Sequence, residues 1–222
     1  YIEVGATTPL SKFELIIKKY YPDFDRILKR YGSVQIRNVA TLAGNIATAS
    51  PIGDSLPLLL SLDASISIES FNKKMTIPLK DFFIGYRKTK LKKGQFISSI
   101  KIPIFKKNIF KAYKISKRID DDISSVCASF NLAIVNKKIK DIKIAYGGMA
   151  ATPKRAVYCE KMLLNSNFSE DIILKAQKSL ERDFQPIDDM RASKDYRVEI
   201  AKNLLTKCFA EIKKNKLIRL NY

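Results

Sequence analysis

One stretch of the chain differs from its surroundings: residues 41–54 read TLAGNIATASPIGD, small and polar residues that include two of the chain's 8 glycines. It lies within residues 32–57, a stretch that is too apolar for a linker and too irregular for a single helix or strand. Segments of this kind usually hold a ligand or form a tightly packed turn. We therefore take residues 41–54 as the candidate functional segment.

The donors and acceptors of this segment favour an anion site. A turn of small residues at Gly44 exposes backbone N–H groups that can point together at a pyrophosphate. Asp54 accepts hydrogen bonds only, which suits ribose or ribityl hydroxyls, and it stands at the N-cap position of an apolar helix predicted over 55–62. Spacing alone leaves open a structural turn followed by a helix cap. Hydroxyl donors lie nearby on Thr41, Thr48 and Ser50.

Upstream of this segment, the pattern predicts a short strand and two helices. Residues 1–5 alternate as a strand does, and Ser11 with Glu14 predicts a capping box that opens a helix ending at Pro22. A second short helix ends near Gly32, which is placed to adopt the left-handed conformation. Downstream, the period of two predicts a hairpin over 64–79 and a strand over 96–104, separated by a short helical patch at 81–83.

A change in composition around residue 106 predicts a second unit. We place a boundary there, with domains at 1–105 and 106–222. The second domain is expected to form a three-stranded antiparallel sheet followed by helices, so the predicted fold class is α+β. The strands are predicted over 109–116, 126–135 and 139–146, and the helices over 154–164, 169–182 and 195–213.

Composition excludes several kinds of chemistry. The chain has no histidine, which removes Ser-His-Asp and Cys-His catalysis and His-ligated zinc. Its three cysteines include no CxxC pair, so we expect buried free thiols in a reducing cytoplasm, with neither a metal site nor an iron–sulfur cluster. No apolar run reaches the roughly 18–20 residues of a membrane span. Since residues 1–5 already read as a strand, we expect the chain to start inside a longer sequence.

The strong positive charge leaves three interpretations open. The chain has 41 Lys+Arg against 22 Asp+Glu, a formal net charge of +19. Such a charge can mark nucleic-acid binding, but the basic residues are spread along the chain and no RNA- or DNA-binding motif accompanies them. A solvated lysine surface, a nucleic-acid face and docking to an acidic partner subunit are the alternatives, and we favour the first.

Several ordered motifs resemble those of one family. Residues 32–38, 41–46 and 49–54 together closely resemble the second flavin-binding lobe of the xanthine dehydrogenase family, and the motifs at 85–89 and 146–150 recur in the same order. The resemblance implies the second lobe of a PCMH-type FAD-binding domain, followed by a carbon monoxide dehydrogenase flavoprotein C-terminal-like domain. The first lobe of that family would lie upstream of Tyr1. Ala43 departs from the pattern, because the family usually has a second glycine there.

The resemblance also implies binding positions for FAD and for NAD. Thr41, Gly44 and Asn45 match the family's loop around the FAD pyrophosphate, and Tyr86 and Asp121 match positions near which nicotinamide approaches the flavin. Tyr31 and Ile97 could instead be core residues, and Lys114 a strand-edge charge. The full set of implied cofactor-binding residues is Tyr31, Thr41, Gly44, Asn45, Thr48, Ser50, Asp54, Ile97 and Lys114.

The chemistry implied by the family is electron transfer. Electrons from hydroxylation of a purine at molybdenum would pass through iron–sulfur clusters to FAD and then to NAD. The molybdopterin and 2Fe–2S groups would belong to partner domains or subunits, in a higher-order oligomer without nucleic-acid or membrane partners. No titratable catalytic residue is required on this chain, because the flavin supplies the redox chemistry.

Two alternatives remain open beside this reading. Carbon monoxide dehydrogenase and aldehyde oxidase flavin subunits share the layout, and the substrate would sit on another chain. A non-catalytic basic module that binds nucleic acid or an acidic partner is the alternative of another class. Within the favoured reading, the hypothesis for the loop at 117–123 is that it gates access of NAD.

Overall fold

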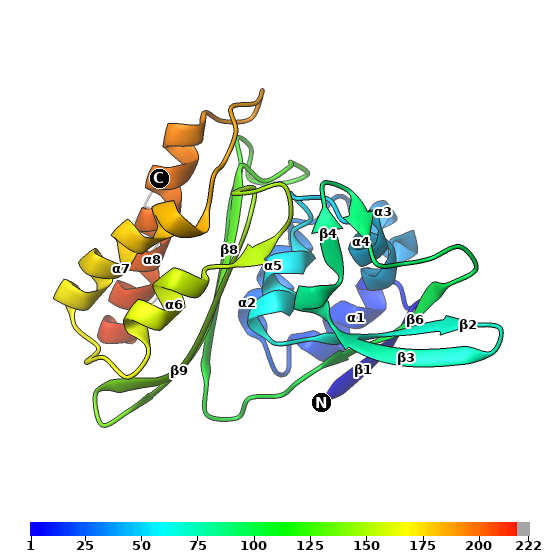
Figure 1. The fold of residues 1–222 in the computed structure, drawn as a ribbon, viewed down its shortest axis with the longest axis horizontal. Helices are drawn as coiled ribbons and strands as arrows, with labels where there is room; N and C mark the ends of the chain where they lie inside the picture. Colours follow the sequence, from blue (N-terminus) through cyan, green and yellow to red (C-terminus); the bar gives the residue numbers. More distant parts are fainter. Residues whose placement is uncertain (217–222) are drawn as a thin grey trace.

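The computed structural model describes residues 1–216. Its central element is an antiparallel sheet of strand order β10-β9-β8-β7, with helices on both faces (Figure 1). Helices α6 (Val157–Leu163), α7 (Glu170–Asp183) and α8 (Lys194–Lys214) cover one face, and α2 (Pro22–Lys29) and α5 (Ser55–Ser61) pack on the other. The strands are β7 (Ile109–Ile115), β8 (Val126–Val135), β9 (Lys138–Gly147) and β10 (Lys154–Arg155).

Strand β8 shows why this sheet is covered on both sides. Successive side chains of a strand point to opposite faces. Cys127 accordingly belongs to the core shared with α2 and α5, whereas its neighbours Val126 and Ala128 belong to the core beneath α6, α7 and α8. All three residues are fully buried. The two halves of the chain therefore share this sheet as a common wall.

A second antiparallel sheet, of order β1-β6-β2-β3, carries the N-terminal helices. The predicted hairpin is present, with Ile66 opposite Ile77 and Ile68 opposite Met75. A two-stranded ribbon, β4 (Phe83–Gly85) with β5 (Lys88–Thr89), follows a short 3-10 turn at Leu79–Asp81, where a helical patch at 81–83 was expected. The strands of the larger sheet are β1 (Ile2–Gly5), β2 (Ser65–Ser70), β3 (Lys73–Pro78) and β6 (Phe96–Ile102).

The capping box predicted from Ser11 to Glu14 is wrong. Helix α1 (Leu10–Ile17) begins one residue before Ser11, and its N-cap is Pro9, whose extended backbone (φ −60°, ψ 147°) marks the boundary. The helix also ends at Ile17, well before Pro22, because Pro22 instead opens α2, where proline's missing N–H has no cost. Gly32 does adopt the predicted left-handed conformation, with φ +64°.

The central sheet has a fourth strand that periodicity does not reveal. Lys154 and Arg155 pair with Tyr146 and Ala145 of β9, in place of the helix predicted from residue 154. Arg155 forms ion pairs with Asp63 at 3.1 Å and with Glu160 at 2.7 Å, which hold this short segment extended. Helix α6 therefore begins only at Val157.

The candidate functional segment and its flanks fold into three short helices. They are α3 (Val34–Val39), α4 (Leu42–Thr48) and α5. Thr41 is the N-cap of α4, and its Oγ1 accepts a hydrogen bond from the backbone N–H of Gly44 at 3.0 Å. The predicted irregular turn at Gly44 is thus wrong, because Gly44 lies in the first turn of a helix and its N–H is already bound. Ala49 ends α4 in the left-handed region, with φ 48°.

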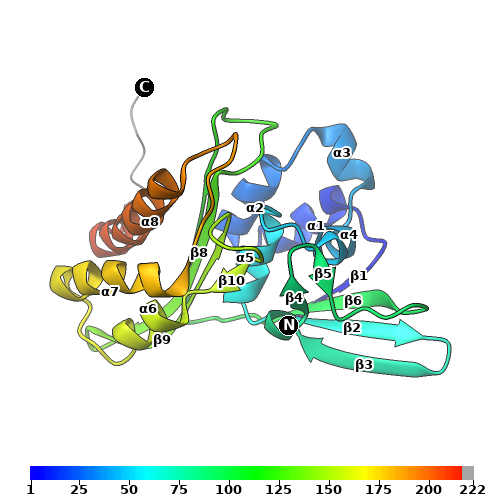
Figure 2. The ribbon, with the colours of Figure 1, turned by 45° about the horizontal axis from the view of Figure 1, so that its top comes forward.

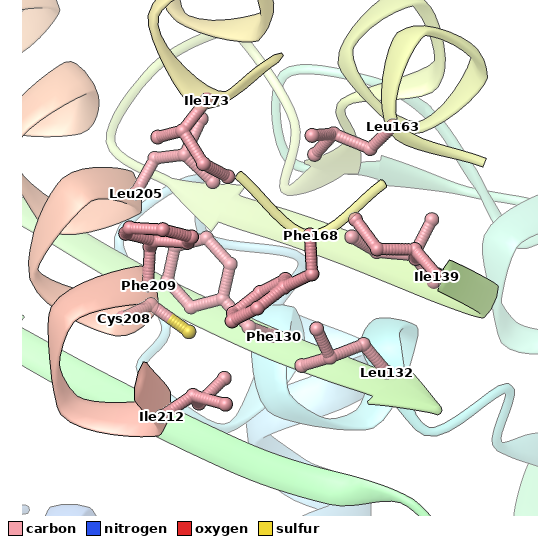
Figure 3. Close-up of a pocket in the computed structure, with 11 residues that line it drawn as sticks. Phe130, Leu132, Ile139, Leu163, Phe168, Ile173, Leu205, Cys208, Phe209 and Ile212 are labelled. Carbon is pink, nitrogen blue, oxygen red and sulfur yellow. The ribbon is translucent and has the colours of Figure 1, made fainter. Parts of the chain in front are cut away.

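The core beneath α6, α7 and α8 contains a small void. Its volume is about 10 Å³, close to the minimum for one water molecule, and aliphatic, aromatic and thiol side chains line it. Phe168 and Phe209, whose ring centroids are 4.6 Å apart, pack against each other in this lining, with Cys208 of α8 nearby (Figure 3). A lining of this kind offers a water no good hydrogen-bond partners, so the void is a packing defect and not a ligand site.

Burial decides the reactivity of the three cysteines. Cys127, Cys159 and Cys208 are buried free thiols, as predicted. Burial raises the pKa of all three, which keeps them protonated and unreactive at neutral pH.

Within residues 1–216, every helix is too short or too polar to cross a membrane.

Candidate functional site

A polar cavity of about 440 Å³ opens where the N-terminal helices meet the β7–β8 end of the central sheet. This volume is in the range of small-molecule sites, about 300–1,000 Å³. The cavity brings together residues predicted from the sequence: Tyr31, Asn45, Thr48, Ser50, Asp54, Lys114 and Asp121. It also has lining residues that were not predicted: Gly32, Ile52, Gly53, Arg87, Asp122, Ile123 and Arg191.

Segments far apart in the chain deliver these side chains. Tyr31 follows α2, and Asn45 and Thr48 project from α4. The remaining sides come from the α4–α5 connection, from Lys114 on β7, from the β7–β8 loop, from the β4–β5 ribbon and from the connection between α7 and α8. The site therefore depends on both halves of the chain being folded together.

The other predicted residues lie away from this cavity. Thr41 caps α4, and Gly44 is exposed on the first turn of that helix. Ile97 is 5% exposed on β6, paired with Ile68 in the hydrophobic core. Tyr86 is 61% exposed at the tip of the β4–β5 ribbon, next to the cavity residue Arg87.

A buried ion pair forms the floor of the cavity. Lys114 Nζ lies 2.6 Å from Asp54 Oδ2 and donates a second hydrogen bond to the carbonyl oxygen of Arg30 at 2.9 Å. Ser124 Oγ donates to Asp54 Oδ1, and the Cys127 thiol donates to the Asp54 carbonyl oxygen. Asp54 and Lys114 are each 5% exposed, so the pair is almost completely removed from water.

This arrangement changes the role expected for Asp54. Asp54 occupies the N-cap position of α5, but within residues 1–216 its side chain makes no capping bond, because the carboxylate is turned toward Lys114 and Ser124. An ionised carboxylate has about four lone-pair sites. Two are used by these donors, which leaves acceptor capacity on the cavity side.

Tyr31 forms an aromatic wall above this floor. Burial raises the pKa of its phenol, and the negative charge of Asp54 raises it further. The hydroxyl therefore stays protonated at neutral pH. Tyr31 can present both a ring face for stacking and an O–H donor to a ligand.

Asn45 and Gly53 form a close contact at the side of the cavity. Ser55 Oγ donates to Asn45 Oδ1 at 2.6 Å, which orients the amide and leaves its N–H₂ as a donor group. A Cβ at Gly53 would stand 3.2 Å from Asn45 Nδ2 and 3.0 Å from Leu56 Cδ1. A side chain at residue 53 would therefore require Asn45 and Leu56 to shift by a few tenths of an ångström.

The β7–β8 loop covers the cavity with acidic side chains. Arg30 fixes the loop by donating to the Ile119 carbonyl oxygen at 2.7 Å and to Ser116 Oγ at 3.0 Å. A hydrogen bond from the Arg118 N–H lowers the pKa of Asp122, against the effect of desolvation. Asp121 has a left-handed backbone, φ 49°, a strained conformation of the kind often found at functional sites.

Basic side chains face the cavity from two other segments. Arg87 sits on the β4–β5 ribbon with φ 51°, again in the left-handed region. Arg191 comes from the connection between α7 and α8. Arg87 lies within the 85–89 motif named from the sequence, but its side chain was not predicted to line a site. Nothing in the pattern around Arg191 marked it.

The lining suits a nucleotide cofactor. It combines an aromatic face, hydroxyl and amide donors, three carboxylates, a lysine and two arginines. These are the groups that the ring, sugar and phosphate parts of a dinucleotide need. FAD therefore fits the donor and acceptor set of this cavity.

Two protein-family models match the chain almost end to end. Residues 1–105 match the FAD-binding domain in molybdopterin dehydrogenase, and residues 111–212 match the carbon monoxide dehydrogenase flavoprotein C-terminal domain. Together the two matches take in both of the hydrophobic cores described above.

Curated proteins of similar sequence include both short and long chains. The glyceraldehyde dehydrogenase medium chain of Sulfolobus acidocaldarius is 32% identical over 217 residues, covering 95% of this chain and 75% of that one. The xanthine dehydrogenase of Blastobotrys adeninivorans is 36% identical over 202 residues, covering 82% of this chain. The chain spans only 12% to 15% of the length of the nicotinate hydroxylase and xanthine dehydrogenases that it matches in Emericella nidulans and B. adeninivorans.

Two solved structures share the fold. The carbon monoxide dehydrogenase of Hydrogenophaga pseudoflava superposes with a TM-score of 0.87 at 24% identity, over 92% of this chain and 72% of that chain. The quinoline 2-oxidoreductase of Pseudomonas putida gives a TM-score of 0.86 at 21% identity, over 97% of this chain and 76% of that chain. At these identities the likeness establishes the mixed fold of antiparallel sheets and helices.

Proposed function

Because the chain belongs to the FAD-binding domains of the molybdopterin dehydrogenases, we propose that it holds FAD in the 440 Å³ cavity and serves as the flavin part of a xanthine dehydrogenase-type molybdenum hydroxylase. The observation that carries the proposal is the convergence of predicted residues on one cavity. Tyr31, Asn45 and Asp54 come from three different segments, and all line it.

Each of these residues has a defined part in holding the cofactor. Ser50 Oγ accepts from the Ile52 N–H at 3.4 Å, so its own O–H is available to a ligand. Thr48 donates its hydroxyl proton to the Gly44 carbonyl oxygen at 2.8 Å, so it offers the ligand an acceptor. When bound, FAD would supply the redox chemistry, while the chain orients it and excludes water around the buried ion pair of Asp54 and Lys114.

The route of electrons is a further part of the proposal. Molybdopterin and 2Fe–2S groups on partner domains or subunits would deliver electrons, and NAD would accept them beside Tyr86 and Asp121. The position of Tyr86 on the exposed tip of the β4–β5 ribbon, next to a cavity residue, supports an approach from that side. We place the complex in the cytoplasm, since all three cysteines are free thiols.

A second candidate differs in the substrate of the partner subunit. The S. acidocaldarius relative is a glyceraldehyde dehydrogenase medium chain, and this chain covers 75% of it, against 14% of the B. adeninivorans xanthine dehydrogenase. The 32% identity to that medium chain supports an aldehyde-oxidising assembly as the alternative, and the cavity proposed for FAD would be the same in both. Identification of the molybdenum subunit that copurifies with this chain separates the two candidates.

Flavin binding by the 222-residue chain tests the proposal directly. We expect the wild-type chain to bind FAD with quenched flavin fluorescence. Asn45→Ala should weaken FAD binding about tenfold, because it removes a neutral hydrogen-bond donor together with its packing against Gly53.

The matched control is Asn203→Ala, which removes an exposed amide on α8 that bonds only Glu199 among the contacts described, and it should leave FAD affinity unchanged. Absence of FAD binding by the wild-type chain would contradict the proposal. Salt-sensitive retention of DNA by the flavin-free chain would instead favour the basic-module alternative.

A further inference from the structure

The connection between α7 and α8, residues 184–193, is named here the strap. It rises beside the β7–β8 loop, where it is drawn in orange in Figure 2. The strap contributes one side chain to the cavity, that of Arg191. It is the part of the site furthest along the chain from the candidate functional segment.

A buried arginine fixes the strap from below. Arg197 on α8 is 2% exposed, and its guanidinium lies 2.6 Å from Asp189 Oδ1. The same guanidinium donates to the carbonyl oxygens of Gly148, at 3.0 Å, and of Ser125. Asp189 Oδ1 in turn accepts the backbone N–H of Arg191 at 2.8 Å. The backbone at Arg191 is therefore tied to the end of the central sheet.

The β7–β8 loop holds the strap from the other side. Lys117 Nζ donates to the Met190 carbonyl oxygen at 2.9 Å, and Ser125 Oγ donates to the Arg191 carbonyl oxygen at 3.4 Å. The guanidinium of Arg191 makes only weak contacts: it lies 3.7 Å from Asp189 Oδ2 and donates to Met190 Sδ at 3.4 Å. Its backbone is thus fixed while its charged end remains able to reach a ligand.

The other cationic and amide groups near the cavity are less available to a ligand than Arg191 is. Lys114 is committed to Asp54 and to the Arg30 carbonyl oxygen, and the Gly44 N–H is bound by Thr41. Arg87 is exposed on a ribbon of two short strands. Among the three cavity cations within residues 1–216, Arg191 combines a fixed backbone with a charged end that has no buried ion-pair partner.

We propose that Arg191 binds a nucleotide phosphate in this cavity and that Arg197, through Asp189, is its positioning residue. The inference rests on the proposed function, since it assigns a phosphate contact within the same site. The ligand chemistry is the diphosphate of a dinucleotide. That diphosphate could belong to the resident FAD or to an incoming nucleotide that accepts electrons.

The test compares ligands that differ in phosphate content. FAD, FMN and riboflavin are titrated against the wild-type 222-residue chain, Arg191→Ala and Arg191→Lys, with circular dichroism and thermal melting as checks on folding. Arg191→Ala should weaken FAD binding about ten- to a hundredfold and leave riboflavin binding within about twofold. Arg191→Lys should fall between, because lysine keeps the charge but loses the planar fork.

A matched control removes the same charge elsewhere. Arg182→Ala, on α7 where Arg182 stacks on Tyr158, should leave all three affinities unchanged. A second arm measures binding of ADP-ribose to the flavin-loaded chain. If Arg191→Ala spares FAD and weakens ADP-ribose tenfold or more, the phosphate belongs to the incoming nucleotide.

Two results would overturn the assignment of Arg191. One is unchanged binding of FAD and ADP-ribose in Arg191→Ala, and the other is an equal loss of riboflavin and FAD, which would indicate general damage to the cavity. A wild-type chain that binds neither FAD nor riboflavin would overturn the proposed function, and this inference with it.

Discussion

Two cavities of this molecule differ in what lines them. The 440 Å³ cavity is lined by charged, amide, hydroxyl and aromatic groups that come from segments between Tyr31 and Arg191. The 10 Å³ void in Figure 3 lies inside one core and is lined by apolar side chains and a thiol. The larger cavity has a buried ion pair as its floor, whereas the void has only packing around it. Space alone does not make a site, and convergent polar groups distinguish the two.

The largest effect on stability is expected from disrupting the Asp54–Lys114 ion pair that forms the floor of the polar cavity. Lys114→Met leaves the carboxylate of Asp54 buried without its cation, which should lower the free energy of unfolding by about 3–5 kcal/mol. Urea denaturation of the 222-residue chain measures it. Lys138→Met, at an exposed position of β9, should change the free energy by less than about 0.5 kcal/mol.

A double variant sharpens this prediction. Asp54→Leu combined with Lys114→Met replaces both charges by apolar side chains and should recover most of the lost stability. It should not recover FAD binding, since the polar floor is gone. If Lys114→Met alone stays within about 1 kcal/mol of the wild type, the ion pair is not the structural floor described here.

A smaller effect is expected at the void, and on stability alone. Ile173 on α7 is 4% exposed and lines the void, so Ile173→Val enlarges it by one methyl group. The free energy of unfolding should fall by about 0.5–1.5 kcal/mol, with FAD affinity unchanged. Urea denaturation and FAD titration measure the two quantities.

The exposed neighbour Leu174 supplies the control, because Leu174→Val should change stability by less than about 0.5 kcal/mol. A change of FAD affinity beyond about twofold in Ile173→Val would show that the two cavities are coupled. The contrast between a binding site and a packing defect would then fail.

Local patterns in the sequence were enough to predict most of the framework. The hairpin at β2–β3 and the strands β7, β8 and β9 follow from alternation over six or more residues, which is a local signal. The capping box was wrong because Pro9, two residues earlier, already fixes the extended backbone that begins α1. Strand β10 escaped notice because two residues carry no period, and it exists only through pairing with Tyr146 and Ala145 of β9.

The site was predicted less completely than the fold, because it depends on contacts between residues that lie far apart in the sequence. The segment from residue 41 to 54 stood out by composition, and residues that line the cavity were named from it. The partnership of Asp54 with Lys114 and Ser124 spans 60 and 70 residues, so only tertiary packing reveals it. Arg191 depends on hydrogen bonds to the β7–β8 loop and on Arg197, none of which is visible in the spacing of residues. That the cavity residues bind FAD stays a prediction.

The smallest effect is expected in the strap, as a dependence of the melting temperature on pH. Burial works to raise the pKa of Asp189, but the N–H groups of Arg191 and Ala192 and the charge of Arg197 outweigh it, so the pKa lies below its ordinary value. A lowered pKa in the folded state contributes stability that is fully present above the unfolded pKa of about 3.9. That contribution is lost as pH falls through the folded pKa.

Asp189→Asn should remove this contribution while keeping the shape of the side chain and an Oδ1 acceptor. The difference in melting temperature between wild type and variant should therefore be constant above about pH 5 and shrink toward acid. Asp195→Asn, at an exposed position of α8, is the control and should show no such trend. A difference that grows as pH falls would have the wrong sign. It would show that the charge of Asp189 does not stabilise the strap.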